Sequence, residues 1–337
     1  MQRISRRQFS QQAARATAAT AFLPGLTAHG DATDSRADQA LITITLDLEM
    51  SRHYPTRGTL HWDYEKGNLD TDTKRYSREA ARRVKDLGGI IHFFCVGRVL
   101  EQENIEWLEE IIETGHPVGN HTYDHVNVHA RQAEQLQFRF QRAPWLIRGK
   151  TPAEVIEHNI AMASWAMQQR LGIEPAGFRT PGGFYRGIED RPDLQQMLMR
   201  LGFDWVSSRY PRFQTAVKTQ RPDEAVFQTI IESQTRAQPY TYPTGLIEVP
   251  MSPISDVNAM RSLRWTTEAF LEAVDRAVLW AIENRAVFDF LAHPSCLVVT
   301  DPAFRVIERI CKRVQEAGDR AALVSLDALA RRAQGAA

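Results

Sequence analysis

The sequence predicts a parallel α/β fold, either a barrel or a doubly wound sheet. Short apolar segments alternate with amphipathic helical segments over most of the 337 residues, starting near residue 41. Several helical segments end at a glycine, which is the usual C-terminal stop of a helix. Polar residues follow several of the apolar segments, and functional sites gather at such strand ends in parallel α/β folds.

In the first part of the chain, apolar and β-branched runs predict strands, and helical periodicity predicts the segments between them. The expected strands are 41–48, 90–96, 117–120, 176–179 and 203–207. The expected helices are 74–87, 104–114, 151–171 and 190–201. The helix over 151–171 has the clearest limits. Thr151-Pro152 supplies a cap residue and a proline at the first helical position, and Gly172 follows the last turn.

Residues 209–262 break this alternation and hold six prolines. We expect an insertion here, with some strand content at 226–231 and 246–249. The alternation then resumes and continues toward the end of the chain. Helices are expected at 267–284, at 302–317 and from Ser325 onwards, and strands at 287–292 and 321–324.

Charge and composition bear on several classes of function. The formal net charge is zero, which gives no support for nucleic-acid binding. The three cysteines form neither a CxxC motif nor a zinc-ligand spacing. Beyond the N-terminal region, no segment is long and apolar enough to span a bilayer.

The N-terminus has the features of an export signal. Ser5-Arg6-Arg7-Gln8-Phe9 precedes a mildly apolar run over 13–26, which is too short for a membrane span. The Arg-Arg-x-Phe form resembles a twin-arginine signal, and a disordered arginine-bearing N-terminus is the alternative. We therefore expect a signal peptide at 1–30, a linker at 31–40 and one domain at 41–332. The precursor would use the twin-arginine export machinery, and the mature protein would be periplasmic or extracellular.

Two acidic residues, Asp47 and Glu49, stand at the end of the first expected strand. Residues i and i+2 of a strand point to the same face, so both carboxylates would project into one cavity. Such a pair is costly unless a metal ion, an arginine or a shared proton compensates its charge. The alternative is an exposed strand end with two solvated acids.

His121 and His125 follow the expected strand at 117–120. Histidines at i and i+4 can face one metal ion if the segment begins a helix. Imidazole suits Zn²⁺, Fe, Co or Ni, and either Glu49 or Asp47 would supply an oxygen ligand. A polar helix start with incidental histidines is the alternative.

Two further strand ends carry candidate residues. Arg179 precedes a glycine-containing turn with Gly182, and an arginine there would hold a carboxylate through two hydrogen bonds. Glycine also lets backbone N–H groups approach a ligand closely. His293 follows the strand at 287–292 and is a candidate general acid or base, because histidine has an ordinary pKa of about 6.5. A surface arginine in an ordinary turn, and a structural histidine, are the alternatives.

Taken in order, these motifs resemble those of the polysaccharide deacetylase family, also called the NodB-homology family or carbohydrate esterase family 4. They are Asp-x-Glu, His-x-x-x-His, Arg-x-Pro-x-Gly and Leu-x-His, within roughly residues 41–325. The segment His92-Phe93-Phe94-Cys95-Val96-Gly97 adds to the resemblance, because the family has a similar strand before its histidines. The resemblance implies an irregular (β/α)7-type barrel with an insertion at about 209–262.

The resemblance also implies an activity, which is metal-dependent hydrolysis of N-acetyl or O-acetyl groups of a glycan with release of acetate. The implied roles are Asp47 as catalytic base, Glu49, His121 and His125 as metal ligands, Arg179 as the partner of the base, Gly182 as a backbone donor of the oxyanion hole, and His293 as general acid. Asp204, in Gly202-Phe203-Asp204-Trp205, matches an aspartate that orients this histidine. Zinc is the expected metal, with Co, Ni, Fe or Mn as alternatives.

The sequence departs from the commonest pattern of the family, which has two adjacent aspartates. Here Leu48 separates Asp47 from Glu49, and this form resembles a subgroup with some peptidoglycan deacetylases and amide-ring hydrolases. A metal-dependent cyclic amide or imide hydrolase acting on a small molecule is therefore one alternative function. A non-catalytic glycan-binding protein on the same fold is another. The sequence leaves the identity of the glycan and the oligomeric state open.

Overall fold

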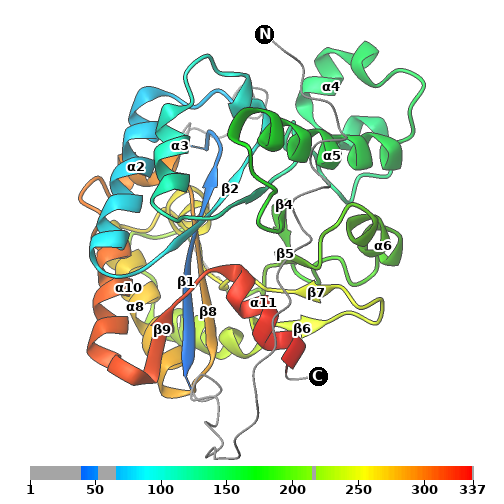
Figure 1. Cartoon of the computed structure of the whole chain (residues 1–337). Helices are drawn as coiled ribbons and strands as arrows, with labels where there is room; N and C mark the ends of the chain where they lie inside the picture. The colour runs from blue at the N-terminus through cyan, green and yellow to red at the C-terminus, as the bar shows by residue number, and fades with distance from the viewer. Residues whose placement is uncertain (1–38, 52–65, 215–217, 336–337) are drawn as a thin grey trace, which may run out of the picture. The chain divides into compact units, whose positions relative to one another are not determined.

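The computed structural model describes residues 39–51, 66–214 and 218–335 of the chain (Figure 1). The chain separates into two units, Met1–Ser35 and Arg36–Ala337, and all described residues belong to the second. The expected signal peptide at 1–30 and nearly all of the expected linker at 31–40 lie outside the described residues.

A mainly parallel sheet forms the centre of the second unit. Its strands are β1 (Ala40–Leu48), β2 (Ile91–Cys95), β3 (Val118–Asn120), β4 (Phe178–Phe184), β5 (Trp205–Arg209), β6 (Tyr240–Thr241), β7 (Ile247–Glu248), β8 (Val287–Ala292) and β9 (Ala321–Leu323). The order across the sheet is β6-β7-β5-β4-β3-β2-β1-β8, and β9 pairs with the start of β1. Only the β6–β7 pair is antiparallel among these strands. All nine residues of β1 are buried, as expected for a parallel strand covered on both faces.

The sheet curls into an open barrel, and no strand ladder joins β8 to the far end of the sheet among the described residues. Single hydrogen bonds bridge this gap instead. The N–H of Ser252 donates to the carbonyl oxygen of Asp289 at 3.0 Å. The side-chain amide of Gln238 pairs with the backbone N–H and carbonyl of Val287 at 2.8 and 3.1 Å. The predicted α/β fold of the irregular barrel type is confirmed.

Helices cover the outside of the curled sheet. They are α2 (Thr71–Asp86), α3 (Glu106–Glu113), α4 (Phe138–Arg142), α5 (Pro152–Leu171), α6 (Pro192–Arg200), α7 (Glu224–Ser233), α8 (Thr267–Glu283), α9 (Pro294–Thr300), α10 (Arg305–Ala317) and α11 (Leu326–Gly335). A π-helix, η6 (Val257–Leu263), and the short 3₁₀ helices η2 (Gly97–Glu101), η3 (Ala133–Gln135), η4 (Pro144–Ile147), η5 (Gln234–Arg236) and η7 (Gly318–Arg320) complete the set. Helices α3, α2, α10 and α8 lie side by side in that order (Figure 1). Among the described helices, none has the length and apolarity needed to cross a membrane.

Local capping explains where helices begin and end. In α5 the Thr151 side chain accepts a hydrogen bond from the N–H of Glu154, whose carboxylate accepts one from the N–H of Thr151. Gly172 ends this helix with φ +67°, so both predicted limits are confirmed. Helix α2 begins at Thr71, earlier than predicted, because the Asp70 side chain caps it through the N–H of Thr73.

The predicted strand at 226–231 is wrong, because this segment lies within α7. Its β-branched residues favour a strand locally. The buried side chains Phe227, Ile230 and Ser233, however, recur at helical spacing, and α7 packs against α8. Tertiary packing therefore overrides the local preference. The predicted strand at 246–249 is confirmed as β7.

Replacing Gly177 by alanine should lower the free energy of unfolding by about 2–4 kcal/mol, because backbone strain and overpacking add. Gly177 has φ +78°, and a Cβ there would lie 2.0 Å from the Trp205 ring. Gly149→Ala is the matched control, since Gly149 has φ +80° and open space at its Cβ position. Urea unfolding measures both variants. Equal losses in the two variants would contradict the packing argument.

Candidate active site

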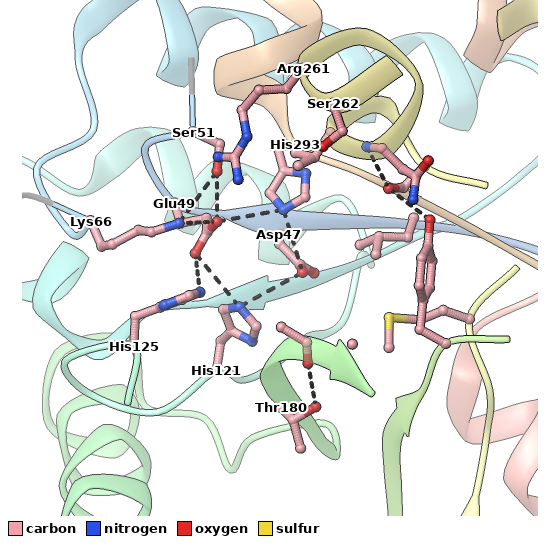
Figure 2. A pocket seen from close by; sticks show the side chains of 18 residues that line it. Asp47, Glu49, Ser51, Lys66, His121, His125, Thr180, Arg261, Ser262 and His293 are labelled. Carbon is pink, nitrogen blue, oxygen red and sulfur yellow. Dashed lines mark hydrogen bonds and ion pairs between the residues drawn. The ribbon is translucent and has the colours of Figure 1, made fainter. Parts of the chain in front are cut away.

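The two carboxylates at the end of β1 point into one pocket of about 280 Å³. Figure 2 shows the side chains of Asp47 and Glu49 facing the same side, with His121, His125 and His293 around them. Both acids are buried, and Leu48 between them packs into the hydrophobic core. The alternation of a strand therefore places the pair as predicted, and the alternative of two solvated acids is excluded.

A buried arginine compensates the charge of Asp47. Arg179 on β4 is fully buried, and its Nη1 donates to Asp47 Oδ1 at 3.2 Å. Its Nη2 donates to Asp289 Oδ2 at 2.5 Å, and the guanidinium lies 4.4 Å from the ring centroid of Phe94. Arg179 therefore has the predicted partner, but it is shared between two carboxylates.

Sequence reasoning missed Asp289, although its position carried a signal. It lies in the middle of β8, whose other residues are apolar and whose whole length is buried. Thr43 and Thr45 donate to its Oδ1 at 3.0 and 2.8 Å. Burial raises the pKa of Asp289 despite the opposing charge of Arg179. An acid inside a buried apolar strand requires a cationic partner, which Arg179 supplies.

The two oxygens of Glu49 have different environments. Oε1 accepts hydrogen bonds from Ser51 Oγ at 2.7 Å and from Lys66 Nζ at 2.5 Å. Oε2 is buried without a hydrogen bond of good geometry among the described residues, and His125 Nε2 lies against it. Burial raises the pKa of Glu49, but His125 and Lys66 outweigh this effect and hold the pKa well below its usual value. Sequence reasoning missed Lys66, which is remote from every motif.

His121 and His125 lie in a loop after β3 and not at the start of a helix. Thr122 and His125 adopt left-handed backbone conformations with φ +57° and +60°. Such residues cost about 1–3 kcal/mol each and persist where the surroundings impose them. The loop rests on Gly97, whose N–H donates to the carbonyl of Thr122 at 2.9 Å and whose Cβ would strike Tyr123. This loop, and not a helix, turns both histidines toward Glu49.

The protonation of the two histidines suits metal binding. His121 Nδ1 lies 2.9 Å from the carbonyl oxygen of Arg179, so Nδ1 carries the proton and Nε2 presents its lone pair to the pocket. Burial lowers the pKa of His121 and lowers that of His125 to about 4, so both rings are neutral at neutral pH. Neutral imidazole is the form that binds metal ions.

Glu49, His121 and His125 together have the arrangement of a divalent metal site. Their ligand atoms lie within 4.8 Å of one another. Oε2 of Glu49 has no hydrogen bond of good geometry among the described residues, and the two neutral imidazoles offer ring-nitrogen lone pairs close to it. A metal ion would accept an electron pair from each of these three side chains. Two imidazoles and one carboxylate accept several divalent metals, so the residues fit a metal without selecting one.

The aspartate that orients His293 is Asp256, and the prediction of Asp204 for this role is wrong. Asp204 is exposed just before β5. Asp256 is fully buried, and its Oδ1 accepts a hydrogen bond from His293 Nδ1 at 2.9 Å. Its Oδ2 accepts one from the His293 N–H at 2.8 Å. Asp256 comes from the segment expected to be an insertion, and no spacing rule links it to His293.

His293 completes the pocket from the end of β8. Its Nε2 lies 3.5 Å from Glu49 Oε1 and 4.0 Å from Asp47 Oδ2. Burial alone would lower the pKa of His293, but the carboxylates of Asp256, Glu49 and Asp47 raise it above the ordinary value. His293 therefore holds a proton in the pocket at higher pH than an isolated histidine does.

Gly182 lies in a break of the sheet at the edge of the pocket. The β4–β5 ladder is irregular between Arg179 and Phe184, and Gly182 has φ +79° within this break. Thr180 Oγ1 donates to the carbonyl of Gly182 at 2.8 Å and fixes the turn. Gly182 thus lines the pocket, and its predicted role as an oxyanion-hole donor stays a prediction.

Comparison with known proteins agrees with this geometry. Residues 67–196 match the family model described as polysaccharide deacetylase. This match covers 130 of the 337 residues, less than half of the chain. The matched part includes His121, His125, Arg179 and Gly182. A sequence comparison with curated proteins gives no significant match.

Solved structures show the polysaccharide deacetylase fold over most of the chain. A structure from Mycobacterium smegmatis, assigned to this family, is 15% identical with a TM-score of 0.57, covering 89% of this chain and 92% of its own. One from Pseudomonas aeruginosa PAO1 is 14% identical with a TM-score of 0.55, covering 88% and 91%. An allantoinase is 13% identical with a TM-score of 0.50, covering 88% and 90%.

Replacing Asp256 by asparagine should lower the pKa of His293 in the metal-free protein, because a negative charge beside Nδ1 is lost. Asp204→Asn makes the same chemical change at the exposed aspartate and should leave this pKa unchanged. Titration of the imidazole signals by NMR measures both variants. An unchanged His293 pKa in Asp256→Asn would contradict the assignment of Asp256.

Proposed function

We propose that this protein is a metal-dependent deacetylase that hydrolyses N-acetyl groups of a glycan and releases acetate, with O-acetyl groups as the alternative. One observation carries this proposal: a carboxylate held by a buried arginine, a Glu/His/His cluster and an aspartate-held histidine face one pocket, in a chain whose residues 67–196 match the polysaccharide deacetylase model. No single motif would support it to the same degree, because each has a structural alternative.

Glu49, His121 and His125 would hold the metal, most simply zinc. When bound there, a divalent ion polarises a carbonyl group and lowers the pKa of water. Ser51 and Lys66 fix one oxygen of Glu49, so the other oxygen is turned toward the histidines. The chain itself therefore orients the ligand set before any ion arrives.

Asp47 is placed to act as the general base. Its Oδ1 is occupied by Arg179, while its Oδ2 lies 3.7 Å from His121 Nε2 and 4.0 Å from His293 Nε2. A water molecule among these groups would give its proton to Oδ2 as its oxygen attacks the acyl carbon. General-base assistance of this kind contributes about 10²–10⁴-fold to a rate.

His293 is placed to act as the general acid. Asp256 holds its Nδ1, so Nε2 points into the pocket. The raised pKa keeps a proton on the ring, which Nε2 would donate to the leaving amine nitrogen as the carbon–nitrogen bond breaks. The Gly182 N–H would donate to the oxyanion of the tetrahedral intermediate.

We also propose that the chain is exported. The basic head and short apolar run in residues 1–30 support a twin-arginine signal, with 31–40 as a linker. A periplasmic or extracellular location would bring the enzyme to envelope or environmental glycans.

A second candidate, hydrolysis of a cyclic amide in a small molecule, is favoured by two observations. The fold matches that of an allantoinase with a TM-score of 0.50, and the pocket has a volume of only about 280 Å³. The same base and acid would serve this reaction, since it also breaks a carbon–nitrogen bond.

The metal assignment predicts that the chain binds a single divalent ion and that Glu49→Ala, His121→Ala or His125→Ala weakens binding by more than about 100-fold. Loss of a group that only supports a ligand already costs about 10–100-fold. His129→Ala is the control, because this nearby ring packs against Phe184 with the ring centroids 4.2 Å apart and lies outside the cluster. Calorimetry with Zn²⁺ and Co²⁺ measures the affinities. Unchanged affinity in all three ligand variants would refute the site.

Replacing Asp47 by asparagine should reduce acetate release by about 10²–10⁴-fold while metal binding persists, because the base is lost and the ligands remain. Acetate would be measured with chito-oligosaccharides, peptidoglycan and acetylated xylan, and Asp204→Asn serves as the control with activity retained. Full activity in Asp47→Asn would overturn the base assignment.

The wild-type result separates the candidate functions. Acetate release that a chelator abolishes supports the deacetylase. Bound metal with no acetate release, but with ring opening of cyclic ureides, supports the cyclic amide hydrolase. Glycan binding with neither reaction supports a non-catalytic binding protein.

A further inference from the structure

A buried lysine lies against the carboxylate of the candidate metal site. Lys66 Nζ donates to Glu49 Oε1 at 2.5 Å and to Ser51 Oγ at 3.4 Å, and the Lys66 side chain is only 5% exposed. An ammonium group at this depth needs a negative charge close to it, which Glu49 provides. Lys66 also lines the pocket, although no sequence motif includes it.

The backbone on both sides of Lys66 fixes its position. The N–H of Met50 donates to the carbonyl oxygen of Lys66 at 3.0 Å and ties this segment to the residue after Glu49. Gly67 packs tightly against η2, because a Cβ there would lie 2.4 Å from the Cβ of Arg98 and 2.8 Å from its carbonyl carbon. Glycine permits this close approach. The fold therefore places the ammonium group beside the carboxylate.

The donors and the histidines contact different oxygens of Glu49 (Figure 2). Ser51 Oγ joins Lys66 at Oε1, to which it donates at 2.7 Å. Oε2 lies against His125 Nε2 and 3.8 Å from His121 Nε2. A carboxylate can bind a metal ion through one oxygen or through both. With Oε1 engaged by two donors, Glu49 presents Oε2 alone to the histidines.

The charge of Lys66 opposes the binding of a cation. Groups that support a metal ligand usually strengthen binding, and their loss weakens it by about 10–100-fold. An ammonium group beside the ligand carboxylate acts in the opposite direction, because it repels a divalent ion. This repulsion is strong where water is excluded, and Glu49 is only 3% exposed. Loss of the Lys66 charge should therefore strengthen metal binding.

Binding through a single carboxylate oxygen suits a catalytic metal better than a structural one. Catalytic zinc sites have three protein ligands and keep a further position for water or substrate, whereas structural sites are closed. Glu49, His121 and His125 would supply three ligand atoms. A second oxygen from Glu49 would compete for the position that the proposed reaction needs open.

We propose that Lys66 is a positioning residue that restricts Glu49 to one metal-binding oxygen and lowers the affinity of the site for its divalent ion. This inference rests on the metal site of the proposed deacetylase and concerns how that site is kept open. Lys66 acts through Glu49 and takes no part in making or breaking bonds.

The first test is calorimetry with Zn²⁺ on the full chain carrying Lys66→Met, which removes the charge and the donor at similar length. Zn²⁺ should bind this variant about 10-fold or more tightly than the wild type. Without metal the variant should unfold at lower urea concentration, because Glu49 loses its buried cation. Added Zn²⁺ should therefore stabilise it more than it stabilises the wild type. A merely structural role of Lys66 would lower stability without tightening metal binding.

Lys66→Gln separates the two effects and decides the affinity question if Lys66→Met fails to fold. Glutamine removes the charge but keeps a donor for Oε1, so zinc affinity should rise while Glu49 still binds through one oxygen. Crystals of zinc-loaded Lys66→Met should show both oxygens of Glu49 on the ion, and its acetate release should fall despite the tighter binding.

Two further variants serve as controls for charge. Lys66→Arg keeps the positive charge and the donor, so it should retain an affinity close to that of the wild type. Lys312→Met removes a lysine charge from α10, where the side chain is 68% exposed, and should leave zinc affinity unchanged.

The outcomes separate this inference from the proposed function. Unchanged or weaker binding in the neutral variants of a zinc-binding protein overturns the role of Lys66 and leaves the deacetylase standing. Tighter binding with one Glu49 oxygen on the ion in Lys66→Met overturns the restriction of the carboxylate. Tighter binding as proposed, without acetate release from any form, supports the role of Lys66 and refutes the deacetylase. Absence of zinc binding in the wild type and in both neutral variants overturns both.

Discussion

The buried guanidinium of Arg179 is the contact on which the candidate site depends. It lies between Asp47 and Asp289, which stand on neighbouring strands in the interior of the curled sheet. Two carboxylates at this depth without a cation would repel each other and lose their hydration. With Arg179 in place, Asp289 is fully engaged and Asp47 keeps one oxygen, Oδ2, for the pocket. The ion pair between Arg179 and Asp47 thus both stabilises the buried carboxylate and leaves its Oδ2 facing the pocket.

The two carboxylate oxygens of Glu49 also have different partners. Ser51 and Lys66 occupy one of its oxygens, and the other faces two neutral histidines. The backbone carbonyl of Arg179 fixes the tautomer of His121, so one residue orients the base through its side chain and a metal ligand through its main chain. The side chain at position 179 therefore acts on Asp47, its main chain acts on His121, and Lys66 acts on Glu49 and Ser51.

Residues at strand ends were predictable from the sequence, because parallel strands deliver their C-terminal residues to one rim. Asp47, Glu49, His121 and His293 follow this rule, whereas Arg179 is the second residue of β4 and precedes the irregular part of the β4–β5 ladder. Asp256 does not, since its place depends on how the segment after β7 packs against β8. The apolar run of α7 was predicted as a strand for the same reason. Asp204 was also wrongly assigned, because the residues around it match a motif although its side chain faces solvent. The local sequence pattern therefore predicts where the strands end. Which later segment contributes to the site depends on tertiary packing, which that pattern does not contain.

The segment expected to be an insertion is therefore part of the site. It supplies Asp256, which orients His293, and Arg261, which lines the pocket. The family model matches residues 67–196, which contain both metal-site histidines and Arg179 but neither Asp256 nor Arg261. The match therefore bears on His121, His125 and Arg179 and not on the segment after β7. Asp256 holds the histidine proposed as general acid, so this part of the proposed chemistry depends on a segment that the matched region does not include.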